Sequence, residues 1–437
     1  MPDRPLRILF MPESAYGPTG NCMGIGDVLL KRGHDVVFAA ESSWQGKLEP
    51  LGFVEDLVDL APPTEDTEQD PGQFWKDFIK ETSPEFRKPT IEQLSSFIQP
   101  TFQALIDGAK YCEPQLREII ERQRPDVIVE DNVVSFPALT TADAPYVRIT
   151  SCNPLEVKGM GVAPTFSGLP AADASSWQEF REEYERTHRP MWDDFNEFVI
   201  KQGARPLADL EFIHESTQAN LYVFPEEADY VNERPLGPLW HRLDSSVRST
   251  DEPFTIPQSL DSLGSRDADS ALVYLSLGSL GSADVDLMRR LVEVLSTSRH
   301  RFIVSKGPQH AEYDLADNMW GAEFLPQTSI IPLVDLVITH GGNNTTTEAF
   351  HFGKPMVVLP LFWDQYDNAQ RVDELGFGRR LATYAFADSE LHRAIDSLVE
   401  DADLTARLAS VGERIRARDG KAKAASVIES VGRTGSE

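Results

Sequence analysis

One stretch of the chain, residues 335–378, constrains the fold more than any other. It reads DLVITHGGNNTTTEAFHFGKPMVVLPLFWDQYDNAQRVDELGFG. Its apolar runs at 336–338 and 356–359 are typical of buried parallel strands, and the segment between them predicts a helix. A helix that begins in Asn and Thr after a Gly-Gly turn presents free backbone N–H groups to an anion. An ordinary capped turn is the simpler alternative, but three successive Thr are poor helix formers, so the pattern favours a phosphate site.

The rest of the chain repeats this strand–helix order on both sides of an aperiodic segment. The first half predicts strands at 6–11, 35–40, 125–131 and 146–150, with a helix at 23–32. The second half predicts strands at 271–277 and 300–305 before the stretch above, and three helices after it. Between the halves, residues 236–270 lose periodicity and gain Ser, Asp and Pro, as linkers do.

The predicted fold class is therefore α/β, with two facing, doubly wound Rossmann-like domains and an interdomain cleft. We expect an N-terminal domain at 1–235, the linker at 236–270 and a C-terminal domain at 271–437, whose last helix can pack back on the first domain.

Composition restricts the partners. The chain has 437 residues and a net charge of −29, which disfavours binding to nucleic acid or to anionic membranes. Its three cysteines, Cys22, Cys112 and Cys152, lie far apart and predict neither a disulfide framework nor a zinc site. No apolar run is long enough to span a membrane, and the start does not resemble a signal peptide. We expect a cytoplasmic monomer or homodimer that acts on small molecules.

Polar residues at the predicted strand ends suggest sites for phosphate and for sugar hydroxyls. A Gly/Ser turn around Ser279 can lie opposite the Gly341-Gly342 turn, so that a diphosphate could bind between the two turns. Glu348 lies one helical turn beyond Asn344 and can accept hydrogen bonds from a ribose diol. Asp364 and Gln365 can hold vicinal sugar hydroxyls, although an N-cap role for Asp364 is equally plausible. The chain has neither the dinucleotide fingerprint nor a P-loop, which argues against redox and ATPase functions.

The stretch from residue 324 to residue 372, FLPQTSIIPLVDLVITHGGNNTTTEAFHFGKPMVVLPLFWDQYDNAQRV, resembles the nucleotide-sugar signature of the UDP-glycosyltransferase superfamily. This superfamily comprises inverting GT-B enzymes, and the similarity is to its bacterial natural-product and macrolide type. Weaker similarity covers most of the chain, as in RGHDVVFA, PDVIVED and ALVYLSLGS.

The resemblance implies a donor site in the C-terminal domain. The nucleotide base would lie by Phe324 and Gln327, and the diphosphate by the Gly342 turn. Ribose would bind Glu348, and the donor sugar would bind Asp364 and Gln365. The implied phosphate ligands are Ser279, His340, Asn344 and Thr345. The resemblance also implies no cofactor and no metal, and a bidentate Glu348 favours UDP over TDP.

One departure from the family concerns the catalytic base. The family pattern AYGH places a His in the loop after the first strand, where an Asp orients it. This chain reads Ala15-Tyr16-Gly17-Pro18-Thr19, so Pro18 occupies the base position. Asp131 matches the orienting Asp and is itself a candidate base, as is Glu13. We expect the acceptor near Tyr16, Pro18 and Thr19.

Three functions follow from these observations. The first is a hexosyltransferase that moves a hexose from a UDP-glucose-like donor to a small, largely apolar acceptor. The second, motivated by Pro18, is a catalytically silent donor-binding or accessory protein. The third is a nucleotide-sugar epimerase, which needs no acceptor. The sequence favours the first.

Overall fold

Two parallel sheets form the framework of the protein. The structure is a computed structural model and describes residues 4–62, 82–247, 252–264 and 270–434. The first sheet has seven strands in the order β3-β2-β1-β4-β5-β6-β7. Its strands are β1 (Arg7–Pro12), β2 (Asp35–Phe38), β3 (Val54–Glu55), β4 (Val127–Asp131), β5 (Tyr146–Thr150), β6 (Ala219–Tyr222) and β7 (Trp240–Arg242).

The second sheet has six strands in the order β10-β9-β8-β11-β12-β13. Its strands are β8 (Leu272–Ser276), β9 (Arg301–Ser305), β10 (Met319–Ala322), β11 (Leu336–Thr339), β12 (Met356–Val358) and β13 (Gly378–Arg380). Every pairing in both sheets is parallel. The predicted α/β class with two Rossmann-like domains is confirmed, and the central strands are apolar because helices cover both faces of each sheet.

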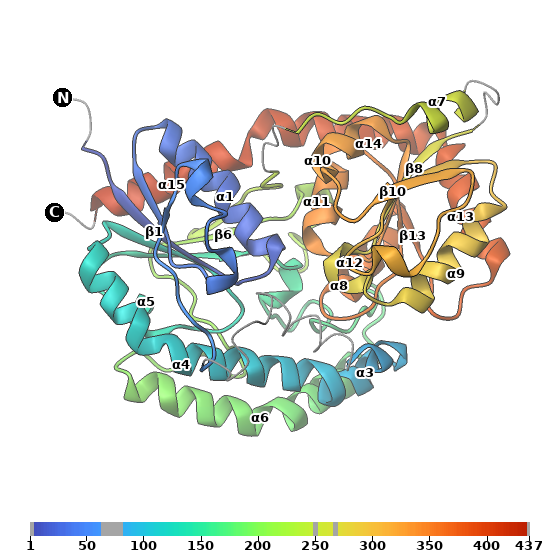
Figure 1. Ribbon diagram of the computed structural model, residues 1–437. Helices are drawn as coiled ribbons and strands as arrows, with labels where there is room; N and C mark the ends of the chain where they lie inside the picture. The colour runs from blue at the N-terminus through green and yellow to red at the C-terminus, as the bar shows by residue number, and fades with distance from the viewer. Residues whose placement is uncertain (1–3, 63–81, 248–251, 265–269, 435–437) are drawn as a thin grey trace.

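Helices surround the two sheets, which lie side by side in Figure 1. The longer helices of the first half are α1 (Tyr16–Lys31), α4 (Gln99–Gln123) and α6 (Trp177–Lys201). Those of the second half are α9 (Val285–Ser296), α11 (Asn343–Phe352), α12 (Gln365–Glu374), α13 (Asp388–Val399), α14 (Ala402–Arg418) and α15 (Gly420–Thr434). Short helices are α3 (Thr90–Gln93), α5 (Pro137–Thr140), α7 (Gln258–Gly264), α8 (Gly278–Gly281) and α10 (Gln327–Ile330). None of the described helices combines the length and apolarity needed to cross a membrane.

Helix α1 begins earlier than the sequence predicted. We expected a loop at 12–21 and a helix at 23–32, but α1 starts at Tyr16. Gly17 and Pro18 read as loop residues, yet a proline is tolerated in a first helical turn, where its missing N–H has no intrahelical partner. A side chain at Gly24 would lie 3.2 Å from Lys421 of α15, so the glycine there serves close helix packing.

The predicted linker at 236–270 contains regular structure that its composition did not reveal. Residues 240–242 form β7, which pairs with β6 and extends the first sheet beyond residue 235. A three-residue strand is too short to show the alternation by which strands are recognised. Residues 258–264 form α7, which contacts the second sheet.

The last helix, α15, returns to the first domain and packs against α1, β4, β5 and β6. In Figure 1 it is the red helix that lies beside β1 and α1, far from α13 and α9. Its residues Ala424, Ala425 and Ile428 are fully buried in one apolar cluster with Ile8 and Phe10 of β1. The core of the first domain therefore includes the end of the chain.

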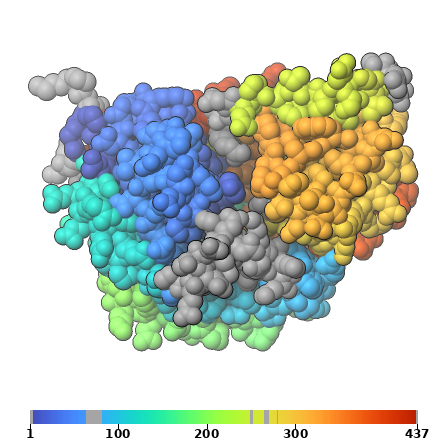
Figure 2. Space-filling model, viewed as in Figure 1, coloured from blue at the N-terminus to red at the C-terminus, as the bar shows by residue number. Residues whose placement is uncertain are grey.

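The domains also meet through aromatic side chains. Phe362, which follows β12, lies 4.7 Å from Phe86 and 5.1 Å from Phe97, measured between ring centroids. Arg87 of the same segment pairs with Asp284 of the second domain at 3.2 Å. Figure 2 shows the two lobes next to each other, the N-terminal one in blue and the C-terminal one in orange and yellow.

We predict that Ile428→Ala will destabilise the first domain although residue 428 lies near the end of the chain. The Ile428 side chain is fully buried, and removing such a side chain costs about 2–5 kcal/mol of folding free energy. Urea unfolding followed by circular dichroism should show a lower midpoint. Ser430→Ala, an exposed position on the same helix, is the control. Equal midpoints for the two variants would contradict the packing of α15.

Candidate functional site

The strand order of the second sheet locates a ligand site. β8 pairs with β9 on one side and with β11 on the other. After β8 the chain continues to one side of the sheet, to β9, and after β11 it continues to the other side, to β12. Ligands of open α/β sheets bind at the carboxyl ends of strands at such a switch point. Here the turn after β8 begins at Gly278 and the turn after β11 contains His340.

The His340 ring lies between two glycines at this switch point. A Cβ added at Gly278 would lie 2.9 Å from the ring carbon Cε1, and one at Gly342 would lie 2.5 Å from Nε2. Gly278 also has a φ of 71°, which favours glycine. Burial lowers the pKa of His340 to about 4, opposed by a backbone hydrogen bond at Ser276. The imidazole is therefore neutral at pH 7 and offers a hydrogen bond rather than a charge.

Helix α11 begins beside His340. Gly342 is its N-cap residue and no described side chain caps it, so its first N–H groups stay available for an anion. Asn344 lies in this first turn, but its side chain reaches across to α1: its Nδ2 donates to Gly17 O at 2.9 Å, and its Oδ1 accepts from Asn21 Nδ2 at 2.9 Å. The sequence had assigned Asn344 to a phosphate.

The residues predicted to hold the nucleoside lie together. Gln327 Nε2 donates to Thr345 Oγ1 at 3.1 Å and to Glu348 Oε2 at 2.5 Å. Phe324, three residues before Gln327, is 61% exposed, which is unusual for a large apolar side chain. An amide and a nearly buried carboxylate thus meet on α11, and an exposed ring precedes the amide by three residues. This grouping suits a base and a ribose.

Ser279 belongs to α8, the short helix that follows β8. Its backbone therefore stands at the same switch point as His340. The side chain of Ser279 lies outside the part of the chain that the structure describes.

Asp364 and Gln365 stand at the start of α12, as the sequence suggested, but their hydrogen bonds go to the protein. Asp364 Oδ2 accepts from Asn153 N of the first domain at 2.8 Å, and burial raises the pKa of Asp364 to about 7. Gln365 Oε1 accepts from the backbone N–H groups of Leu361 and Phe362 at 3.0 and 3.3 Å. The predicted sugar clamp thus touches the first domain.

The first sheet has its own switch point, between β1 and β4. Pro12 of β1 pairs with Asp131 of β4, and Glu13 N donates to Asp131 O at 2.7 Å. The Asp131 side chain is 2% exposed and accepts from Ser151 Oγ at 2.8 Å; its other oxygen lies 4.0 Å from Cys22 Sγ. Burial raises the pKa of Asp131 to about 8, which keeps much of this carboxyl protonated at pH 7.

Pro18 lies one helical turn before Cys22 on α1, so positions 18 and 22 share a face of that helix. A side chain at 18 therefore points to the same side as Cys22, whose sulfur approaches Asp131. This is the relation that the AYGH pattern implies between a base and its orienting Asp. Tyr16 is 59% exposed, whereas Thr19 is buried and donates to Glu13 O at 3.0 Å.

The two switch points face each other. The bonds of Asn344 to Gly17 and Asn21 join the start of α11 to the start of α1. Beside them, Asn343 Nδ2 donates to Ser151 O at 2.7 Å and to Val223 O at 3.0 Å. The expected interdomain cleft is thus bridged directly by side chains at its centre.

Several residues of this junction were not predicted as site residues: Asn21, Asn153, Asn343, Asp367 and Asn368. Four of them had an available signal, because Asn153 follows a strand end and Asn343, Asp367 and Asn368 lie in the first turn of a helix, where polar groups gather in open α/β sheets. Asn21, in the second turn of α1, had no such signal. What the sequence did not reveal is that they bind the opposite domain rather than a ligand.

A small cavity of the first domain opens among aromatic residues. It is lined by Phe102, Phe166, Phe212, Tyr184, Val133, Ile213, Thr165, Glu156, Glu211 and Lys158. The Oγ1 atom of Thr165 is buried without a hydrogen-bond partner in the described structure. Among the described residues, no group of three or more His, Cys, Asp and Glu side chains is placed to hold a metal ion.

Comparison with known proteins agrees with this geometry. Residues 290–429 match the family model described as Erythromycin biosynthesis protein CIII-like, C-terminal domain. The chain is 24% identical over 422 residues to NDP-glycosyltransferase YjiC of Bacillus subtilis (strain 168), covering 95% of this chain and 94% of that protein. It is 23% identical over 430 residues to the oleandomycin glycosyltransferase of Streptomyces antibioticus, covering 97% and 90%.

Solved structures share the fold over almost the whole chain. The glycotransferase of kitacinnamycin superposes with a TM-score of 0.68 at 20% identity and covers 98% of this chain and 99% of its own. Spinosyn rhamnosyltransferase SpnG, 17% identical, has been solved with thymidine diphosphate (TM-score 0.62) and with spinosyn aglycone (TM-score 0.60); each covers 97% of this chain and 100% of its own. The family model and the curated relatives thus point to the macrolide-type UDP-glycosyltransferase superfamily, and the solved structures share its GT-B fold with this chain.

Proposed function

We propose that the protein transfers a hexose from a nucleotide diphosphate sugar to a small, largely apolar acceptor, with inversion at the anomeric carbon. The observation that carries this proposal is the meeting of two switch points at Asn344, one lined for a nucleotide and the other carrying Asp131. An acceptor oxygen would attack the anomeric carbon of the donor sugar while the bond between that carbon and the diphosphate breaks. The acceptor proton must pass to a base.

In this proposal the donor lies along α11. The diphosphate binds at the N-terminus of the helix, where backbone N–H groups and the helix dipole stabilise negative charge. His340, Thr345, Ser279 and the Gly342 turn complete the phosphate site, and Phe324, Gln327 and Glu348 hold the nucleoside. Because these groups already neutralise the leaving diphosphate, the reaction needs no metal. Two oxygens of Glu348 can bind both ribose hydroxyls, which favours UDP over TDP.

The acceptor would bind in the first domain, beside the exposed start of α1 and near the aromatic cavity. Phe102, Phe166, Phe212 and Tyr184 supply an apolar lining, and Lys158 and Glu211 supply polarity. Asp364 lies between this region and α11, since its carboxylate accepts from Asn153 N. There it can reach a sugar hydroxyl when the domains separate enough to admit the donor.

A second candidate function follows from Pro18. Proline accepts no proton, and Asp131 is buried behind Cys22 and Ser151. A protein with these residues can bind a sugar nucleotide without turning it over. The two candidates share the donor site and differ at the base, so separate experiments test each.

The first experiment tests the donor site. We expect UDP-glucose to raise the melting temperature, to do so in EDTA, and to bind more tightly than TDP-glucose. Glu348→Gln should weaken UDP-glucose binding about tenfold or more, since hydrogen bonds to a charged group contribute about 1.5–3 kcal/mol. Glu293→Gln, exposed on α9, should leave the Kd from calorimetry unchanged. If UDP-glucose and TDP-glucose both fail to bind the wild-type chain, the proposed function is wrong.

The second experiment tests the base position. Pro18→His places an imidazole on the face of α1 that approaches Asp131, and general base catalysis contributes about 10²–10⁴-fold to a rate. We expect glucose transfer to phenols to rise at least about tenfold, whereas Lys31→His, at an exposed site in the last turn of the same helix, should not change it. A wild-type chain that transfers nothing and a Pro18→His variant that does would establish the second candidate. No gain in Pro18→His would show that position 18 is not the base position.

A further inference from the structure

Helix α12 connects the donor side of the site to the first domain along its whole length. Its N-cap residue, Asp364, accepts from Asn153 N. One turn later Asp367 and Asn368 also bind the first domain, and Arg371 and Glu374 do so in the next two turns. Each turn of the helix therefore has a partner in the opposite domain, and the partners are mainly backbone groups of irregular segments.

Asp367 makes the most specific of these contacts. Its Oδ2 accepts from Phe166 N at 2.6 Å and its Oδ1 accepts from Gly168 N at 2.8 Å, and the residue is 1% exposed. An acidic residue in a first turn also stabilises its helix through the dipole. That role needs no partner in another domain, whereas here both carboxylate oxygens hold the segment 166–168.

The held segment has an unusual backbone. Phe166 has a φ of 68°, in the left-handed region that a bulky residue rarely adopts, and Gly168 has a φ of 58°. Across the interface, Trp363 has a φ of 57°, and its ring lies 4.7 Å from the ring of Phe166. Two strained aromatic residues from opposite domains thus meet immediately before Asp364. Such strain persists only where surrounding contacts impose it, and it concentrates at functional sites.

Gly168 shows how closely the two domains approach here. A Cβ at this position would lie 2.8 Å from Tyr366 Cβ and 3.0 Å from Tyr366 O. Arg380 Nη1 also donates to Gly168 O at 2.7 Å. The segment is therefore fixed from both sides, by Asp367 at its N–H groups and by Arg380 at its carbonyl.

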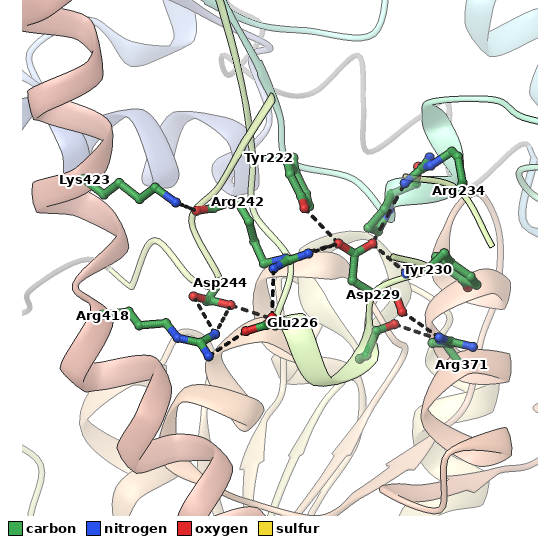
Figure 3. A network of polar contacts seen from close by, with 12 residues as sticks. Tyr222, Glu226, Asp229, Tyr230, Arg234, Arg242, Asp244, Arg371, Arg418 and Lys423 are labelled. Atoms are coloured by element: carbon green, nitrogen blue, oxygen red, sulfur yellow. Dashed lines mark hydrogen bonds and ion pairs between the residues drawn. The ribbon is translucent and has the colours of Figure 1, made fainter. Parts of the chain in front are cut away.

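Arg371 anchors the same helix at a second place, which Figure 3 shows. It donates to Ala228 O at 2.8 Å and to Asp229 O at 2.7 Å. The Asp229 carboxylate in turn accepts from Tyr222 Oη at 2.8 Å and from Arg242 Nη2 at 2.8 Å. Because Arg371 keeps α12 attached to this rigid turn, loss of the Asp367 contact should release only segment 166–168.

We propose that Asp367 is a positioning residue: it holds Phe166 in the conformation that places its ring against Trp363, and so sets the acceptor side of the site against the donor sugar. The inference rests on the proposed function, because segment 166–168 borders the aromatic cavity assigned to the acceptor. It adds a residue that contacts neither substrate and that acts through a backbone segment of the other domain.

Asp367→Asn tests the proposal, because asparagine keeps the shape but replaces one acceptor oxygen by an NH2 group facing a backbone N–H. With umbelliferone as the acceptor probe and UDP-glucose as donor, we expect the KM for umbelliferone to rise about tenfold. The Kd of UDP-glucose and its slow hydrolysis without acceptor should stay within about twofold of the wild type. Asp401→Asn is the matched control, since Asp401 accepts from Leu404 N at the start of α14, within its own domain.

Gly168→Ala supplies a second, independent disturbance of the same segment, through the clash with Tyr366. It should reproduce the rise in KM while Asp367 stays intact. Hydrogen–deuterium exchange provides a readout that needs no acceptor. The amides of Phe166 and Gly168 should exchange faster in Asp367→Asn than in Asp401→Asn.

The outcomes separate the proposals. Unchanged KM and unchanged amide exchange in Asp367→Asn would overturn the positioning role. Parallel losses of donor affinity, acceptor KM and melting temperature would also overturn it, in favour of a general structural role. If the wild-type chain binds no UDP-glucose, the proposed function fails, and amide exchange alone then decides whether Asp367 holds the segment.

Discussion

The hydrogen bonds of Asn344 with Gly17 and Asn21, in the first two turns of α1, join the two halves of this protein. Each sheet offers a binding edge where its strand order reverses, and the residues of one edge alone recognise only one substrate. The Asn344 contacts bring these two edges together. In the proposed function, these contacts place the neutral His340 and the buried Asp131 on two sides of one site.

The interface between the two domains is polar, and its buried backbone N–H groups have hydrogen-bond acceptors on the opposite domain. Irregular backbone at Asn153, Phe166, Gly168 and Ala171 receives its hydrogen-bond partners from side chains of α12 and its N-cap. Buried N–H groups need such partners, because an unpaired one costs about 1–3 kcal/mol. The same burial raises the pKa of Asp364 to about 7 and that of Asp367 to about 8. The domains therefore dock in one specific arrangement, which depends on carboxyl groups whose ionised form is costly to bury.

The sequence predicted the framework well and the junction poorly, for physical reasons. A strand such as β11 is apolar and bounded by polar residues, so its pattern identified it. The predicted helix at 23–32 was shorter than α1 because Gly17 and Pro18 resemble loop residues. Strand β7 was not predicted because a strand of three residues shows no periodicity. Gln327, Thr345 and Glu348 were named from one motif and do lie together. Asp367 was not named, since its partners, Phe166 and Gly168, are backbone groups distant in sequence.

The return of α15 to the first domain has a consequence for how the protein is made. Ala424, Ala425, Ile428 and Val431 belong to the same apolar cluster as the strands of the first sheet. On the ribosome, those strands emerge long before α15, so the first domain has to wait with part of its core exposed until the entire second domain has been synthesised. Domains are usually finished in the order of their synthesis; here the domain that is begun first is completed last.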